Sequence, residues 1–133
     1  MTRDIVVIPQ KIEPLPAIIV KTLPNGYGYI RIRSFVQEGM EDEFEKAMAQ
    51  FSQAKGVIID VRHNPGGRMD AVLTMLNGCL PDKTEVLCLL EAKGKEERYQ
   101  TSGGQRYTMP MAVLTDGQSA SAAEIFAGVL QNQ

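Results

Sequence analysis

Apolar positions in the first half of the chain alternate between strand-like and helix-like spacing. Residues 17–23 and 27–33 flank a Pro-Asn-Gly turn, and the second segment alternates polar with apolar side chains, which predicts a hairpin. Residues 40–54 repeat apolar side chains at helical spacing. Residues 56–61 form a nearly continuous apolar run rich in β-branched side chains, typical of a strand buried on both faces.

The second half continues this alternation. A helix is expected from residue 69, with an apolar stripe and an end near residues 77–78. Residues 84–91 and 97–101 predict the strands of a second hairpin, and residues 111–115 predict a strand before the last helix. Strands that alternate with amphipathic helices indicate an α/β fold with added β-hairpins.

The composition excludes several classes of function but does not identify one. The 133 residues include 14 basic and 16 acidic side chains, for a net charge of -2. The basic residues are scattered, which argues against a nucleic-acid partner. The length fits a single domain, and no apolar run is long enough to span a membrane.

Cysteine and histidine do not form a metal-binding pattern. Cys79 and Cys88 lack Cys-x-x-Cys spacing, and His63 is the only histidine, so no metal or other cofactor is expected. Because Cys79 falls on a helical apolar stripe and Cys88 in a strand-like run, both are predicted to be buried free thiols. His63 is interpreted as an exposed loop residue rather than a catalytic base.

A run of small residues, 119–128, opens the last helix. It places Ser121 near the helix N-terminus, where free backbone N–H groups and the helix dipole favour negative charge. A serine there can act as a nucleophile beside amides that stabilise an oxyanion. Ser121 and Glu124 also fit a capping box, and on these residues alone the plain cap is the stronger interpretation.

A glycine-rich bend, residues 60–67, links the buried strand to the next helix. Gly66 and Gly67 allow close backbone approach, and their amides can bind an oxygen atom, although a turn that merely reverses the chain needs the same residues. Asp60 and Arg62 flank the bend and are expected to form an ion pair or hydrogen bonds that fix the loop.

Three segments in series resemble one protein family. Residues 28–35 read Gly-Tyr-Ile-Arg-Ile-Arg-Ser-Phe, residues 60–67 read Asp-Val-Arg-His-Asn-Pro-Gly-Gly, and residues 119–128 read Ser-Ala-Ser-Ala-Ala-Glu-Ile-Phe-Ala-Gly. In this order they resemble the tail-specific or C-terminal processing proteases, the S41 serine peptidases. The resemblance implies a ClpP/crotonase-like α/β core and hydrolysis of peptide bonds through an acyl-enzyme.

The resemblance also implies residue roles. Ser121 would be the nucleophile, with oxyanion donors in the backbone N–H groups of Ala122 and of the Gly66-Gly67 turn. Supporting polar residues would be Asp60, Arg62, Asn64 and Asn132. The implied base is a neutral lysine downstream of the serine. No lysine follows Ser121, so the base is expected outside this chain, and the isolated chain is expected to be inactive.

Organisation, substrates and location follow from the same resemblance. Residues 17–133 match a protease core, truncated at its C-terminus, and residues 1–16 resemble the segment that follows a PDZ module. The implied substrates are proteins or peptides with apolar C-termini, and the implied location is extracytoplasmic, in the periplasm or cell envelope. Strand edges exposed by the truncation predict self-association.

Two other interpretations stay open at this point. The interphotoreceptor retinoid-binding proteins resemble the same domain, which allows a non-catalytic module that binds an apolar ligand. The intact serine and glycine motifs argue against this alternative. A further alternative is a chain that pairs with a second chain supplying the lysine.

Overall fold

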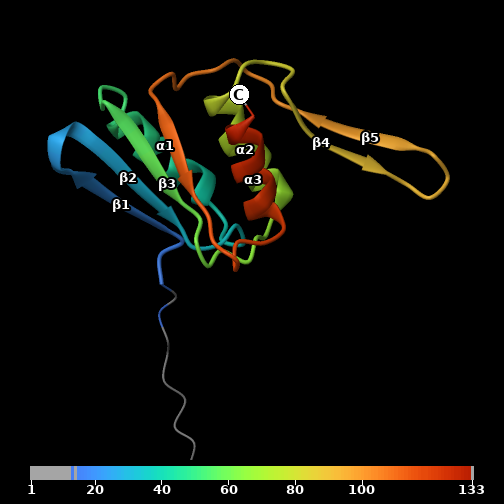
Figure 1. Ribbon diagram of the computed structural model, residues 1–133, viewed down its shortest axis with the longest axis horizontal. Coiled ribbons are helices and arrows are strands. Elements are labelled where there is room, and N and C mark those ends of the chain that lie inside the picture. The colour runs from blue at the N-terminus through green and yellow to red at the C-terminus, as the bar shows by residue number, and fades with distance from the viewer. Residues whose placement is uncertain (1–12, 14, 133) are drawn as a thin grey trace, which may run out of the picture.

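The computed structural model describes residues 13 and 15–132 (Figure 1). Most of the segment 1–16, which resembles the segment that follows a PDZ module, lies outside the described residues. In chain order the elements are β1 (Ile18–Leu23), a 3₁₀ turn (Pro24–Gly26), β2 (Tyr27–Ile32), α1 (Met40–Gln50), β3 (Gly56–Asp60), α2 (Met69–Cys79), β4 (Glu85–Leu90), β5 (Glu96–Gln100), β6 (Met111–Leu114) and α3 (Ala122–Gln131).

The described strands form a four-stranded sheet in the order β1-β2-β3-β6. β1 and β2 are antiparallel, as the predicted hairpin requires, and the positive φ angles of Asn25 (67°) and Gly26 (86°) close their turn. β2, β3 and β6 run parallel, with Ile30, Ile59 and Val113 in register across the sheet. Parallel neighbours need crossover connections, and α1 and α2 lie in these connections.

One face of the sheet carries the core. Ile30 and Ile59 are fully buried on this face, whereas Tyr27 on the opposite face is 42% exposed. On the opposite face of β3, Gly56 and Asp60 are also buried and Ile58 is half-buried. The prediction that this strand is buried on both faces is therefore confirmed at every residue of β3 except Ile58.

Aromatic side chains join the helices to the end of the sheet. The Phe126 ring of α3 packs against Phe35 at 5.6 Å and against Phe44 of α1 at 6.1 Å, measured between ring centroids. All three rings are buried, so α3 is held at its first turns by the core. In the described part of the chain, no helix combines the length and apolar character needed to cross a membrane.

Two helix ends differ from the predicted ones. α1 ends at Gln50 rather than residue 54, because Phe51 leaves the helical conformation and its N–H bonds the carbonyl oxygens of the preceding turn. Gly78 lies inside α2 instead of ending it. A Cβ atom there would lie 2.7 Å from the ring of Tyr107, so the glycine serves close packing.

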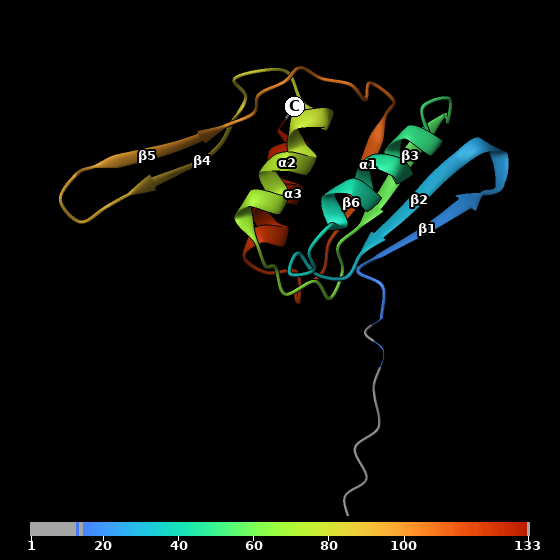
Figure 2. The same ribbon diagram turned by 180° about the vertical axis from the view of Figure 1, so that it is seen from behind.

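The second predicted hairpin, β4–β5, forms its own two-stranded sheet. Figures 1 and 2 show it projecting away from the main sheet, beyond α2 and α3. Cys88 in β4 is exposed, so the prediction of two buried thiols holds for Cys79 and is wrong for Cys88. The run around Cys88 is apolar, but the projecting hairpin has too few neighbours to bury both of its faces.

Candidate active site

Asn64 ties the sequence motifs together. Its side chain is fully buried, and its Nδ2 donates to the carbonyl oxygen of Ile32 at the end of β2 at 2.9 Å. Its Oδ1 accepts from the N–H of Gly66 at 2.8 Å. Its backbone carbonyl accepts from the N–H of Ala120 at 3.0 Å. One buried amide residue therefore fixes the end of β2, the glycine turn and the serine segment relative to one another.

The glycine turn is also bonded to the segment after β2. The N–H of Phe35 donates to the carbonyl oxygen of Gly66 at 2.8 Å, and the N–H of Arg68 donates to that of Phe35 at 2.8 Å. Gly67 has a φ angle of +146°, and a Cβ atom there would lie 2.4 Å from the Phe35 carbonyl carbon. Only glycine fits so close to the neighbouring backbone.

Gly66 packs directly on the serine segment. Its φ angle is +96°, and a Cβ atom there would lie 2.8 Å from the Ala120 carbonyl oxygen, 2.9 Å from the Ser121 Cβ and 3.0 Å from the Ala122 nitrogen. The glycine-rich bend and the serine segment are thus in contact through backbone. Any side chain at Gly66 would separate them.

Ser121 occupies an unusual backbone conformation at the N-terminus of α3. Its φ and ψ angles are 53° and -122°, and its side chain is exposed. Its N–H donates to the Glu124 carboxylate at 2.7 Å, as the predicted capping box requires. Positive φ at a non-glycine residue is costly and is found where the surrounding structure enforces it, often at functional sites.

A hollow of about 250 Å³ adjoins Ser121 and is called the Ser121 hollow here. It is lined by Gly67, Met69, Leu87, Leu89, Tyr99, Ser121, Ala122 and Ile125. Among the described residues, neither the N–H of Gly67 nor that of Ala122 has a hydrogen-bond acceptor, whereas the N–H of Gly66 is taken by Asn64. Ser121, the two residues whose amides lack an acceptor, and several apolar side chains therefore line one hollow.

Asp60 anchors the start of the bend. Its buried carboxylate accepts from the hydroxyl of Tyr29 at 2.6 Å and from the Nη2 and Nε atoms of Arg62 at 2.7 and 3.0 Å. These bonds, those from Arg62 foremost, hold the pKa of the Asp60 carboxyl well below its ordinary range, and Asp60 raises the pKa of Arg62. The expected ion pair is present, and it fixes the loop rather than facing the Ser121 hollow.

His63 is exposed and belongs to a separate polar cluster. Its N–H donates to the Asp116 carboxylate at 3.0 Å, and its Nδ1 lies 2.9 Å from the side-chain oxygen of Gln118. The bond from the His63 N–H is the main cause of the lowered pKa of Asp116. Ser119 donates its hydroxyl to the Val61 carbonyl at 2.8 Å. These contacts hold the serine segment against the end of β3 and leave His63 away from Ser121.

Asn132 lies at the opposite end of α3 from Ser121. Eleven helical steps of about 1.5 Å put roughly 16 Å between them. Asn132 borders a different hollow, together with Glu85, Val86 and Gly128. The structure thus brings Asn64, Gly66, Gly67 and Ala122 to Ser121, keeps Asp60 and Arg62 at the base of the bend, and does not bring Asn132 there. None of the described lysines lines the Ser121 hollow.

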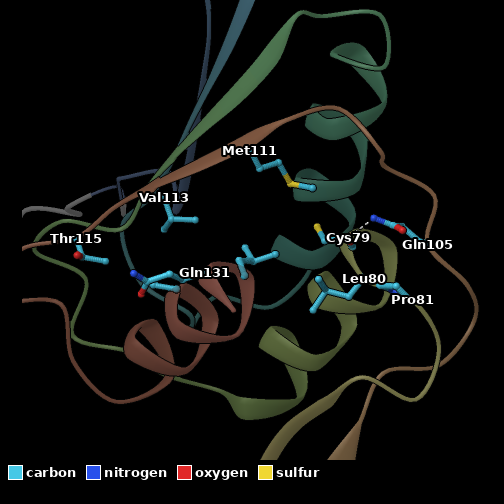
Figure 3. A pocket seen from close by; sticks show the side chains of 10 residues that line it. Cys79, Leu80, Pro81, Gln105, Met111, Val113, Thr115 and Gln131 are labelled. Carbon is cyan, nitrogen blue, oxygen red and sulfur yellow. Dashed lines mark hydrogen bonds between the residues drawn. The ribbon is translucent and has the colours of Figure 1, made fainter. Parts of the chain in front are cut away.

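A larger hollow of about 640 Å³ lies between β6, the end of α2 and α3 (Figure 3), and is called the β6 hollow here. Met111, Val113 and Thr115 project from the β6 side, and Cys79 lies across from them. Burial raises the pKa of the Cys79 thiol to about 12, so this cysteine is unreactive near neutral pH. Ser121 does not line the β6 hollow, so its size does not make it the reaction site.

Sequence reasoning missed the walls of the Ser121 hollow. Leu87, Leu89 and Tyr99 come from the β4–β5 hairpin, which the sequence analysis treated only as structure. The alternation of an apolar strand could have marked one face of β4, but both faces are apolar here. Which face meets Ser121 is decided by how the hairpin packs.

Comparison with known proteins places these motifs in a family. The model of peptidase family S41 matches residues 26–133. The chain is 34% identical over 113 residues to the carboxy-terminal processing protease CtpB of Bacillus subtilis, covering 84% of this chain and 23% of that protein. It is 30% identical over 135 residues to a carboxyl-terminal-processing protease of Synechocystis, covering 99% of this chain and 30% of the relative.

Solved structures give the same fold. The photosystem II D1 C-terminal processing protease superposes with a TM-score of 0.80 at 21% identity, covering 92% of this chain and 35% of that chain. The predicted α/β fold class is confirmed by this match. The chain spans only about a quarter to a third of the length of the relatives it matches, and the relatives do not favour the retinoid-binding alternative. With most of its residues inside the family match, the chain belongs to peptidase family S41.

Proposed function

We propose that this chain carries the nucleophile of a serine endopeptidase that cleaves peptide bonds near protein C-termini, with Ser121 as the attacking residue. One observation carries the proposal. The Gly66-Gly67 turn packs through Gly66 on Ser121 and Ala122, and Ser121 lines one hollow with Gly67 and Ala122, the two residues whose amides lack an acceptor among the described residues. Acyl transfer needs this arrangement, because negative charge develops on the oxygen of the attacked carbonyl group and backbone N–H groups can stabilise it.

The oxyanion donors in this proposal are the N–H groups of Gly67 and Ala122. Both are without acceptors among the described residues and both border the Ser121 hollow. Gly66 is not an oxyanion donor in this proposal, because its N–H is bonded to Asn64. It positions Ser121, because its missing side chain allows the close contact between the two segments. Asn64 is also a positioning residue, because its side chain holds Gly66 in place. Fixed amides stabilise the oxyanion without reorganising during the reaction.

The proposed base is a neutral lysine from outside residues 1–133. A serine hydroxyl is a weak nucleophile at neutral pH and needs a base within hydrogen-bonding distance. A lysine serves only when burial lowers its pKa toward the working pH. The isolated chain is therefore proposed to be inactive. Because Asn132 lies at the opposite end of α3 from Ser121, a supporting role for it would have to act through residues outside 1–133.

Substrates are proposed to be proteins with apolar residues near the C-terminus. The names of the relatives as carboxy-terminal processing proteases support cleavage near the C-terminus, and the apolar lining of the Ser121 hollow supports a preference for apolar residues. An extracytoplasmic location is proposed as well. This proposal is supported by a relative, 31% identical over 130 residues, that is named as a chloroplastic carboxyl-terminal-processing peptidase of Arabidopsis thaliana. Fractionation of cells that produce the protein would check the location.

The test is labelling with a fluorophosphonate probe, applied to residues 1–133 and to a longer version containing the proposed lysine. Label is expected on Ser121 in the longer version alone, and Ser121→Ala should abolish it. Ser102→Ala is the matched control, since Ser102 is an exposed loop serine away from the hollow. Label that persists in Ser121→Ala would contradict the proposal. A folded longer version without label would indicate a binding module.

A further inference from the structure

The β4–β5 hairpin meets the main body at the Ser121 hollow. The hairpin forms a separate two-stranded sheet, yet Leu87, Leu89 and Tyr99 all line this hollow. Leu87 and Tyr99 are directly opposite in the antiparallel register, and Leu89 is two residues along the same strand. Such positions share one face of a hairpin, so these side chains form one continuous wall.

A β-bulge sets the direction of this wall. The register shifts between Glu85 and Leu87, so that Val86 is the extra residue of β4. Val86 is buried against the core, and Leu87 after it lines the Ser121 hollow. The bulge therefore lets two consecutive apolar residues face the body. Val86 packs against the core, and Leu87 is the first residue of the wall.

The wall is apolar and partly unfilled. The described residues that line the hollow carry no charge, and Leu89 remains 44% exposed at its edge. A volume of about 250 Å³ is below the roughly 300–1,000 Å³ of small-molecule sites and suits a single side chain. Gly67 and Ala122, whose amides have no acceptor among the described residues, also line the hollow, and such amides can bind a carbonyl or carboxylate oxygen.

We propose that the hairpin residues Leu87, Leu89 and Tyr99 determine which substrate side chain is accepted immediately before the cleaved bond. The inference rests on the proposed function and deepens it. With the carbonyl oxygen on the amides of Gly67 and Ala122, the side chain of that residue extends into the Ser121 hollow and is covered by the hairpin wall. Large apolar side chains bind, because they remove both their own surface and that of the wall from water.

The experiment measures binding of product-like peptides to the 133-residue chain, so it does not depend on the catalytic base. Peptides identical except for a C-terminal Leu or Ala are titrated, and Kd is followed by NMR. The Leu peptide is expected to bind about tenfold more tightly. Tyr99→Ala should reduce that ratio severalfold. Leu89→Trp, at an exposed edge that tolerates a larger group, should fill the hollow and favour the Ala peptide.

Leu90→Ala is the matched control. Leu90 neighbours Leu89 in the same strand but is 72% exposed and does not line the hollow, so its removal should leave the ratio unchanged. A wild-type chain that does not distinguish the peptides would overturn the inference, as would equal ratios in Leu89→Trp and Leu90→Ala. Preserved discrimination in a longer version that never labels at Ser121 would overturn the proposed peptidase function and leave the binding wall standing.

Discussion

At the scale of single residues, Gly66 and Gly103 offer a matched pair. Both have a φ angle of +96°, but a side chain at Gly103 meets nothing within 4 Å, whereas one at Gly66 meets Ser121 and Ala122. Gly103→Ala should lose about 1–2 kcal/mol of unfolding free energy from backbone strain alone. Gly66→Ala should lose about 1–3 kcal/mol more from overpacking.

Gly66→Ala should also slow probe labelling of Ser121 in the lysine-containing version, by roughly 100-fold, because it displaces the nucleophile from the amides. Chemical denaturation and labelling rates measure the two effects separately. Equal stability and equal labelling in Gly66→Ala and Gly103→Ala would show that the contact between the two motifs has no consequence.

Asp60 predicts a pH dependence of stability. Its pKa is lower in the folded state than its ordinary value of 3.8, because Arg62 and Tyr29 donate to the carboxylate. Between these pKa values the unfolded chain binds a proton that the folded chain does not, so unfolding becomes easier as pH falls. The contribution is complete above the ordinary value and is lost as pH decreases toward the folded value.

Replacing this residue isolates its effect. Asp60→Asn should cost about 1–3 kcal/mol at pH 7, because donors lose a charged acceptor. The difference in unfolding free energy from the unmodified protein should shrink as pH falls below 3.8, the ordinary value. Urea unfolding at pH 7, 5 and 3 checks this. A difference that stays constant over this range would mean that the ion pair does not contribute through its charge.

At the scale of elements, the start of α3 depends on its cap. Glu124 accepts the N–H of Ser121, whereas Glu43 sits in the first turn of α1 on a helix capped by Gly39. Glu124→Ala should cost about 0.5–2 kcal/mol, and Glu43→Ala about 0.3–1 kcal/mol, since the latter loses only the dipole interaction. Thermal unfolding measures both. A loss in Glu43→Ala as large as that in Glu124→Ala would argue against the cap.

At the scale of the whole molecule, β6 is an edge of the described sheet and lies beside the β6 hollow. Met111–Leu114 contains no charged residue, whereas β1 at the other edge contains Lys21. Uncharged edges invite pairing with another chain. The 133-residue chain should therefore associate as concentration rises, and Ala112→Lys should restore the monomer.

Thr22→Lys on β1 is the control and should leave the association unchanged. Size-exclusion chromatography with light scattering gives the mass at each concentration. A monomer at every concentration would remove the prediction.

Much of the fold could be predicted because the main sheet obeys local rules. The turn at Asn25 and Gly26, the β3 run and the stripes of α1 and α2 follow from backbone preference and periodicity. The wrong predictions concern residues whose surroundings are set by contacts distant in the sequence. Gly78 lies inside α2, where its missing side chain accommodates Tyr107, and Cys88 is exposed because the hairpin projects from the body.

The sequence by itself determined the order of elements, the serine at a helix N-terminus and the glycine turn, because these depend on residues close together in the chain. Only the tertiary structure decided that Gly66 contacts Ser121, that Asn64 takes the Gly66 amide and leaves that of Gly67 free, and that the hairpin walls the Ser121 hollow. Such contacts join residues far apart in sequence, and their distances are set by packing of the whole core.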